Sequence, residues 1–204
     1  PTVYEFTSDR GLLYQYFQLR DFMYRKVHKL TEFEGEEDVY DKISHVLIAR
    51  KGNLCVGGCR LTIREADEKF LMPLESEQFR LETILPDCDL SHYRHAELSR
   101  FAVMDSFQDS DVFYHLCKIM HEKVLSEGIR YVFAKSPYTL ARNWRMVAHG
   151  FGAKAKIHND ITIPENPLYP EIKWYITSCD MLKTKEYSKD HHMQTQQHDE
   201  PTIH

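Results

Sequence analysis

The sequence predicts one α/β domain built on a mixed β-sheet with helices on both faces. Its N-terminal half contains two β-prone runs joined by a Gly-containing turn, which is typical of an antiparallel hairpin. Its C-terminal half alternates strands with helices, which implies neighbouring parallel strands joined by right-handed crossovers. At 204 residues and 42% hydrophobic content, the chain can bury one complete core, and nothing requires a second domain.

The composition argues against several classes of protein. A formal net charge of −5 excludes a broadly basic nucleic-acid binder. The longest apolar runs, such as residues 46–49 and 131–134, are too short to cross a bilayer, and the N-terminus lacks the order of a signal peptide. The five cysteines are odd in number and lack zinc-site spacing. We therefore expect a cytoplasmic protein with free thiols, no metal site and no stable membrane insertion.

The N-terminal half is expected to form a helix, a loop and a hairpin. Residues 12–27 repeat apolar side chains at helical spacing, which indicates an amphipathic helix. The acidic residues 31–41 follow no period and are expected to form a loop. The hairpin strands are predicted at 44–49 and 54–63, and adjacent glycines at 57–58 indicate a bulge or a close backbone approach.

The rest of the chain is expected to alternate helices and strands. Helices are predicted at 71–85, 112–125 and 138–148, and strands at 96–104, 130–135, 157–163 and 172–179. Residues 183–204 are polar and have no apolar period. We therefore expect a single domain over 1–182 followed by a disordered tail.

Three polar residues interrupt the apolar strand at 96–104: Glu97, Ser99 and Arg100. Burial raises the pKa of a carboxyl group, whereas a neighbouring arginine lowers it, and this competition produces a usable base near neutral pH. An ion pair that only fixes strand register is the alternative explanation.

The order of these elements, together with the run Glu97-Leu98-Ser99-Arg100-Phe101, resembles the bacterial acyl-homoserine-lactone (autoinducer) synthases, a branch of the GNAT-fold acyltransferases. The resemblance covers roughly residues 12–180 and extends to the related N-acyl amino acid synthases. Other family features follow in the same order, namely an arginine with an aromatic four residues later, an acidic pair and a Gly-Cys-Arg-Leu strand, at Arg20, Tyr24, Asp38, Asp41 and residues 58–61.

The resemblance implies an N-acyltransferase that moves a fatty acyl group from an acyl carrier protein thioester to the amine of a small substrate. The product would be a quorum-sensing signal of the N-acyl-homoserine lactone type or an N-acyl amino acid. Family members usually have a tryptophan in the loop after the first helix, where this chain has Leu30 or Phe33. S-adenosylmethionine, the lactone source, and an amino acid therefore both stay open as amine substrate. No permanently bound cofactor is implied.

Within this resemblance Glu97 is the expected base, and Ser99 lies on the same side of the strand, where it can position substrate or a water. Arg100 has the opposite parity. It joins Glu97 only if the strand bulges between Glu97 and Val103, as GNAT proteins do, and backbone N–H groups freed at 101–103 would then bind the thioester oxygen. The residues expected to bind the amine substrate are Arg20, Tyr24, Asp38, Asp41, Arg60 and Arg100. A purely structural ion-pair network is the alternative for these charges.

The turn at 105–111 favours a carrier-protein donor over coenzyme A. GNAT enzymes that use acetyl-CoA normally have a Gly-rich turn here, whose N–H groups bind the pyrophosphate. This turn has no glycine and three acids, which would repel a phosphate. The third helix has Met146 where many GNAT enzymes have a tyrosine, so no acid for the leaving thiolate is identified.

Two further sets of residues complete the expectation. Carrier protein is strongly acidic, and the acid-free run at 130–156 is expected to dock it through Lys135, Arg142, Arg145 and Lys154. Walls for the acyl chain and pantetheine are expected at Phe79, Phe101, Val103, Leu116 and Phe133, with ordinary core packing as the alternative. The competing functions are an acetyl-CoA-dependent acetyltransferase and a non-catalytic module that binds acyl groups or carrier protein.

Overall fold

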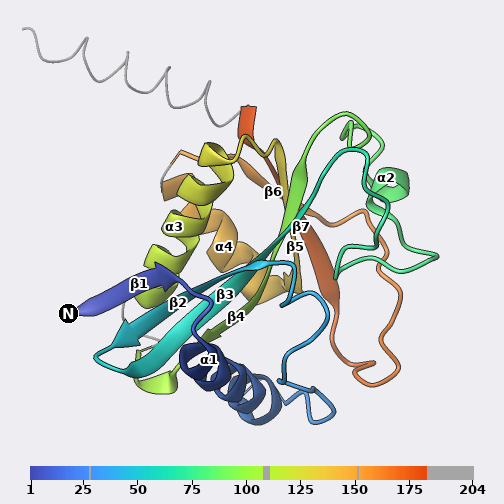
Figure 1. Cartoon of the computed structure of the whole chain (residues 1–204). Helices are drawn as coiled ribbons and strands as arrows, with labels where there is room; N and C mark the ends of the chain where they lie inside the picture. The colour runs from blue at the N-terminus through green and yellow to red at the C-terminus, as the bar shows by residue number, and fades with distance from the viewer. Residues whose placement is uncertain (28, 108–110, 151, 183–204) are drawn as a thin grey trace, which may run out of the picture.

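The structure is a computed structural model that describes residues 1–27, 29–107, 111–150 and 152–182. Its centre is a seven-stranded sheet in the order β1-β2-β3-β4-β5-β7-β6 (Figure 1). The strands are β1 (Thr2–Phe6), β2 (His45–Lys51), β3 (Leu54–Arg64), β4 (His95–Val103), β5 (Tyr131–Pro137), β6 (Ala155–His158) and β7 (Trp174–Asp180). The helices are α1 (Arg10–Phe22), the π-helix η1 (Met23–Val27), α2 (Leu81–Ile84), the 3-10 helix η2 (Asp105–Phe107), α3 (Val112–Ser126) and α4 (Tyr138–Gly150).

The predicted mixed sheet with helices on both faces is confirmed. β1 to β4 are antiparallel, β4 and β5 are parallel, and β7 is antiparallel to both β5 and β6. α1 covers one face, where Tyr16 packs in a cluster with Ile48. α3 and α4 cover the opposite face, where Leu116 packs in a cluster with Val132 (Figure 1). No helix among the described residues is long and apolar enough to span a bilayer.

The connection between β3 and β4 completes the face that α1 covers only in part. Its side chains Leu74 and Phe79 pack with Phe133 of β5 and Ile176 of β7. Two separate apolar clusters therefore share this face, one under α1 and one under the connection.

The predicted helix at 71–85 is wrong except for its last turn, Leu81–Ile84. The buried carboxylate of Glu75 accepts the backbone N–H groups of Met72 (2.9 Å) and Leu81 (2.7 Å). These donors are satisfied by a side chain, so this stretch folds into turns held by Glu75. The hydrophobic periodicity of a sequence does not show that a side chain binds these backbone N–H groups.

Two predictions about the strands, one about their order and one about their bounds, are also corrected. β5 and β6 are not neighbours, because β7 lies between them and pairs with both. The strand expected at 157–163 ends at His158, and Ile161 and Ile163 pack instead against the cluster under the β3–β4 connection. β1 was not predicted: it is a half-exposed edge strand whose pairing with β2 holds it in place. The tail predicted at 183–204 lies outside the described residues.

The close backbone approach predicted at the paired glycines is confirmed at Gly58. A Cβ atom there would lie 2.6 Å from Cδ2 of the Tyr16 ring and 3.0 Å from the Leu47 carbonyl oxygen. Only a residue without a side chain lets α1 pack this closely on β3.

We therefore expect Gly58→Ala to lower the free energy of unfolding by about 2 kcal/mol, because overpacking a rigid buried site costs this much. Gly150→Ala is the matched control, since nothing lies within 4 Å of a Cβ there. Urea denaturation of both variants measures the difference. Equal stability of the two would contradict the steric constraint.

Candidate active site

Strand β4 contains the predicted bulge, and the bulge lies at Arg100. Arg60 of β3 is opposite Ser99 and Gly58 is opposite Ala102, so two residues of β4 face one residue of β3. Arg100 has φ 59°, a left-handed conformation that residues other than glycine seldom adopt. The extra residue shifts by one position the alternation of β4 side chains between the two faces of the sheet. Arg100 thereby reaches the same face of the sheet as Glu97.

Glu97 is almost completely buried, at 4% exposure, on the face that carries α1. Its Oε2 accepts the backbone N–H of Leu74 at 2.7 Å. Burial raises the pKa of Glu97 to about 7, against the Leu74 hydrogen bond and the charges of Arg60, Lys135 and Arg100, which lower it. A carboxyl group with this pKa exchanges a proton with an amine close to neutral pH.

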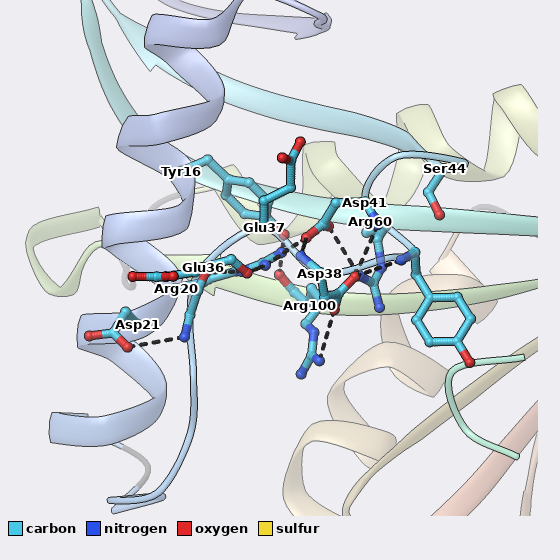
Figure 2. A network of polar contacts seen from close by, with 12 residues as sticks. Tyr16, Arg20, Asp21, Glu36, Glu37, Asp38, Asp41, Ser44, Arg60 and Arg100 are labelled. Carbon is cyan, nitrogen blue, oxygen red and sulfur yellow. Dashed lines mark hydrogen bonds and ion pairs between the residues drawn. The ribbon is translucent and has the colours of Figure 1, made fainter. Parts of the chain in front are cut away.

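Beside Glu97 lies a network of buried ion pairs, which begins at α1 (Figure 2). Arg20 is fully buried and donates to both oxygens of Asp41, at 2.9 and 2.7 Å. It also donates to the carbonyl oxygens of Gly35, at 2.6 Å, and Glu36. One guanidinium thus fastens the acidic loop to α1 with four hydrogen bonds.

The network continues from the loop to the sheet. Arg60 Nη1 donates to Asp38 Oδ1 at 2.7 Å and to Asp41 Oδ1 at 3.0 Å, and Arg100 Nη2 donates to Asp38 Oδ2 at 3.2 Å (Figure 2). Burial would raise the pKa of Asp38, but the hydrogen bond and charge of Arg60 lower it to about 2. The Asp38 carboxylate is therefore held ionised between the guanidinium groups of Arg60 and Arg100.

Aromatic residues complete the wall around Arg100. The Phe33 ring stacks on Tyr24 at 4.4 Å between centroids, and Arg100 Cζ lies 4.9 Å from the Phe33 centroid. Of the two residues that stand near the family's tryptophan, Phe33 thus contacts the network, whereas Leu30 is buried and bonded to the Tyr24 carbonyl. The structure brings together all six residues predicted for the amine substrate.

Some polar atoms in this region have no partner among the described residues. They are Nε and Nη2 of Arg60, Nε of Arg100 and Oγ of Ser99. Buried donors without an acceptor are unfavourable, so the site is completed by water or by a ligand that supplies oxygen atoms.

The sheet opens next to Glu97. β4 pairs with β5 only from His95 to Glu97, opposite Tyr131 to Phe133, although both strands continue further. β4 therefore has an edge without a strand partner from residue 98 onward. Lys135 of β5 lies beyond the last pair, two residues after Phe133 and on the same face. Desolvation lowers the pKa of Lys135, which the charge of Glu97 opposes, although the residue as a whole is exposed to solvent.

The residues predicted as acyl and pantetheine walls do not line one pocket. Phe79 and Phe133 belong to the cluster on the Glu97 face. Phe101, Val103 and Leu116 pack in the cluster on the opposite face, where Phe101 contacts Phe113 at 5.1 Å between centroids. The bulge is the reason for this separation, because it turns the side chains of 101 and 103 toward α3.

The residues predicted for carrier docking are also separated. Lys135 acts electrostatically on Glu97 and lies 6.0 Å from the Trp174 ring. Arg142 is exposed and Arg145 half-buried, both on α4, and no described acid lies within ion-pair distance of either. Lys154 is exposed just before β6.

Two contributors escaped sequence analysis. The Tyr16 hydroxyl donates to the Arg100 carbonyl oxygen at 2.6 Å and so holds the bulge against α1 (Figure 2). Its position four residues before Arg20 on the same helix face was a usable signal. Leu74 acts through its backbone N–H, for which a sequence carries no signal.

An apolar groove of about 390 Å³ between α1 and the ends of β3 and β4 is lined by none of the network residues.

Comparison with known proteins agrees with this arrangement. Residues 19–118 match the family described as an acetyltransferase (GNAT) domain. A search of curated protein sequences finds no match.

Three solved structures illustrate the similarity of fold. The AHL synthase LasI is 14% identical, with 89% of this chain and 90% of that chain covered and a TM-score of 0.60. The CoA-dependent acyl-homoserine lactone synthase BjaI, solved with MTA, is 24% identical, with coverage of 89% and 82% and a TM-score of 0.59. FeeM, an N-acyl amino acid synthase from uncultured soil microbes, is 9% identical, with coverage of 92% and 94% and a TM-score of 0.57.

At these identities the similarity concerns the fold alone. Residues 19–118 thus match a GNAT acetyltransferase domain, and the chain has the fold found in acyl-homoserine-lactone synthases and in an N-acyl amino acid synthase.

Proposed function

We propose that this protein transfers a fatty acyl group from a carrier-protein thioester to the amine of a small substrate, giving an N-acyl-homoserine lactone or an N-acyl amino acid. The observation that carries the proposal is Glu97, a buried carboxyl group with a pKa of about 7 beside the guanidinium groups of Arg60 and Arg100 and at the opening of the sheet. This placement suits a base that acts on an amine near neutral pH.

The proposed chemistry uses two parts of β4, namely the side chains of Glu97 and Ser99 and the backbone N–H groups on its unpaired edge. Glu97, directly or through a water held by Ser99, takes a proton from the amine nitrogen as that nitrogen attacks the thioester carbonyl carbon. Backbone N–H groups on the free edge of β4 stabilise the negative charge on the carbonyl oxygen. The C–S bond then breaks, its electron pair stays on sulfur, and the thiolate takes up a proton. The products are an amide and a thiol.

The amine substrate proposed here also carries a carboxylate. Arg20, Arg60 and Arg100 outnumber the network's two carboxylates, Asp38 and Asp41, and unpartnered donors remain on Arg60 and Arg100. A substrate carboxylate supplies the missing acceptor and charge. Both S-adenosylmethionine and a free amino acid meet this requirement, so the network favours an amino-acid moiety without choosing between them.

A carrier-protein donor is proposed because the turn after β4 suits a phosphate poorly. Asp105 opens this turn and Asp111 closes it, and glycine is absent from it. Residues 108–110, with the third acid, lie outside the described residues. The second candidate donor is an acyl-CoA, which the similarity to BjaI favours, because BjaI is a CoA-dependent synthase.

The first test identifies the product. Purified protein is incubated with acyl carrier protein or acyl-CoA thioesters and with S-adenosylmethionine or amino acids, and mass spectrometry detects the N-acyl amide. Glu97→Gln is expected to lower kcat about 100-fold or more, because it removes the base and keeps the shape. Ser91→Ala, an exposed change outside the site, is the control. Full activity of Glu97→Gln would eliminate the assigned base.

The second test uses the pH dependence of stability. The pKa of Glu97 is raised from 4.5 to about 7 in the folded protein. An acid whose pKa is raised by folding loses stability as the pH increases between those two values. The free energy of unfolding of Glu97→Gln relative to wild type should therefore increase between pH 4.5 and 7, by at most about 3 kcal/mol. Urea denaturation across this range measures it, and a constant difference would refute the raised pKa.

The third test concerns the donor. Reversing the charges of Arg142 and Arg145 together should lower kcat/KM for the acyl carrier protein about tenfold at low salt, and less at high salt. Turnover of the matching acyl-CoA serves as an internal control, and Lys118→Glu on α3 controls for a charge reversal away from α4. Unchanged carrier-dependent kinetics would show that α4 is not the docking surface.

A further inference from the structure

A second buried ionic network lies beside Glu97, and the proposed reaction uses none of its members. It centres on Arg64, the last residue of β3, which is 1% exposed. The guanidinium donates to Glu75 Oε2 (2.7 Å), Glu82 Oε1 (2.7 Å), the Phe70 carbonyl oxygen (2.9 Å) and His95 Nε2 (2.8 Å). These contacts tie the β3–β4 connection to the strand that carries Glu97.

Glu75 is the member that shapes the connection. Its side chain is completely buried. Oε2 accepts from Arg64 and from the Met72 N–H, and Oε1 accepts from the Leu81 N–H. The residue directly before it is Leu74, whose N–H donates to Glu97. A change at Glu75 therefore displaces the one backbone donor that Glu97 has among the described residues.

His95 locks Arg64 in place. Its Nδ1 lies 3.0 Å from the Tyr93 carbonyl oxygen, which can only accept, so the proton is on Nδ1. Nε2 is then a lone-pair acceptor for Arg64. Burial lowers the pKa of His95, which keeps the ring neutral and the hydrogen bond intact near neutral pH. His95 and Glu97 are two residues apart on β4 and share a face, so the lock acts from the same strand as the base.

We propose that Glu75 is a positioning residue for Glu97: it holds the turn that aims the Leu74 N–H at the Glu97 carboxylate, and it thereby sets the charge state of that carboxylate. Arg64 and His95 keep Glu75 in place. The catalytic significance rests on the base role proposed for Glu97, whereas the positioning itself follows from the contacts.

The direction of the effect separates positioning from simple electrostatics. The charged or titratable groups that act on Glu97 come from the neighbouring strands and the acidic loop, namely Arg60, Arg100, Lys135 and Tyr40. Neutralising Glu75 removes a negative charge and leaves Arg64 with less compensation. Both changes would lower the pKa of Glu97. Loss of the Leu74 hydrogen bond would raise it, because that bond stabilises the ionised form.

The test is a carbon-13 NMR titration of labelled glutamate in the full-length protein without substrate, with the Glu97 resonance assigned through Glu97→Gln. Glu75→Gln is expected to raise the midpoint of Glu97 by about one pH unit, the usual size of one hydrogen bond to a charged group. Glu82→Gln is the matched control, because Glu82 pairs with the same arginine but accepts no hydrogen bond from the backbone N–H groups of the turn among the described residues. The titration midpoint of Glu97 in Glu82→Gln should stay unchanged or fall.

Arg64→Lys provides a second variant if Glu75→Gln does not fold. It keeps the positive charge and loses the fork of hydrogen bonds, so a higher midpoint reports geometry alone. A midpoint that is unchanged or lower in the folded variants would overturn the proposal.

An activity profile adds the catalytic readout. With the midpoint raised by one pH unit, kcat/KM of Glu75→Gln should fall about fivefold at pH 7 and recover by pH 9. A loss equal at both pH values would mean structural damage and would also overturn the proposal. If the wild-type protein forms no N-acyl amide while the NMR midpoint moves as expected, the proposed function fails and the positioning stands.

Discussion

The left-handed backbone at Arg100 is the constraint on which the candidate site depends. A residue other than glycine in this conformation costs roughly 1–3 kcal/mol and persists only where its surroundings hold it. Here the Tyr16 hydroxyl binds the Arg100 carbonyl, and Gly58 leaves room for the Tyr16 ring. Without the bulge, Arg100 would point toward α3, and Asp38 would lose one of its two guanidinium partners.

The site balances two costs of burial. Desolvation favours the neutral form of Glu97, while Arg60, Lys135, Arg100 and the Leu74 N–H favour the ionised form. Asp38 shows the other limit, because direct pairing with Arg60 outweighs its burial. Two carboxyl groups on one side of the sheet thus differ in pKa, from about 2 for Asp38 to about 7 for Glu97, because pairing dominates at the first and desolvation at the second.

Sequence reasoning was effective where a side chain's role follows from its own chemistry. The charges of Glu97 and Arg100 in a buried strand indicated that both residues have partners. Strand parity alone showed that the two can share a site only if the strand bulges. It was weaker where the outcome depends on a choice between backbone partners. Glu75 captures N–H groups that a helix would otherwise have used, and β7 inserts between strands that the alternating pattern made neighbours. The separation of Phe79 from Leu116 onto opposite faces also depends on packing across the sheet.

The sequence by itself determined the fold class, because hydrophobic period and the order of the elements are local properties of the chain. The set of charged residues at the site came from the family resemblance, and strand parity showed that Glu97 and Arg100 can share that site only if the strand bulges. Only the tertiary structure decided that the Leu74 N–H meets Glu97, that the charge of Lys135 acts on Glu97 and that Arg64 joins His95 to Glu75. Those contacts join segments far apart in the chain, and their energies depend on distances and desolvation that exist only after folding.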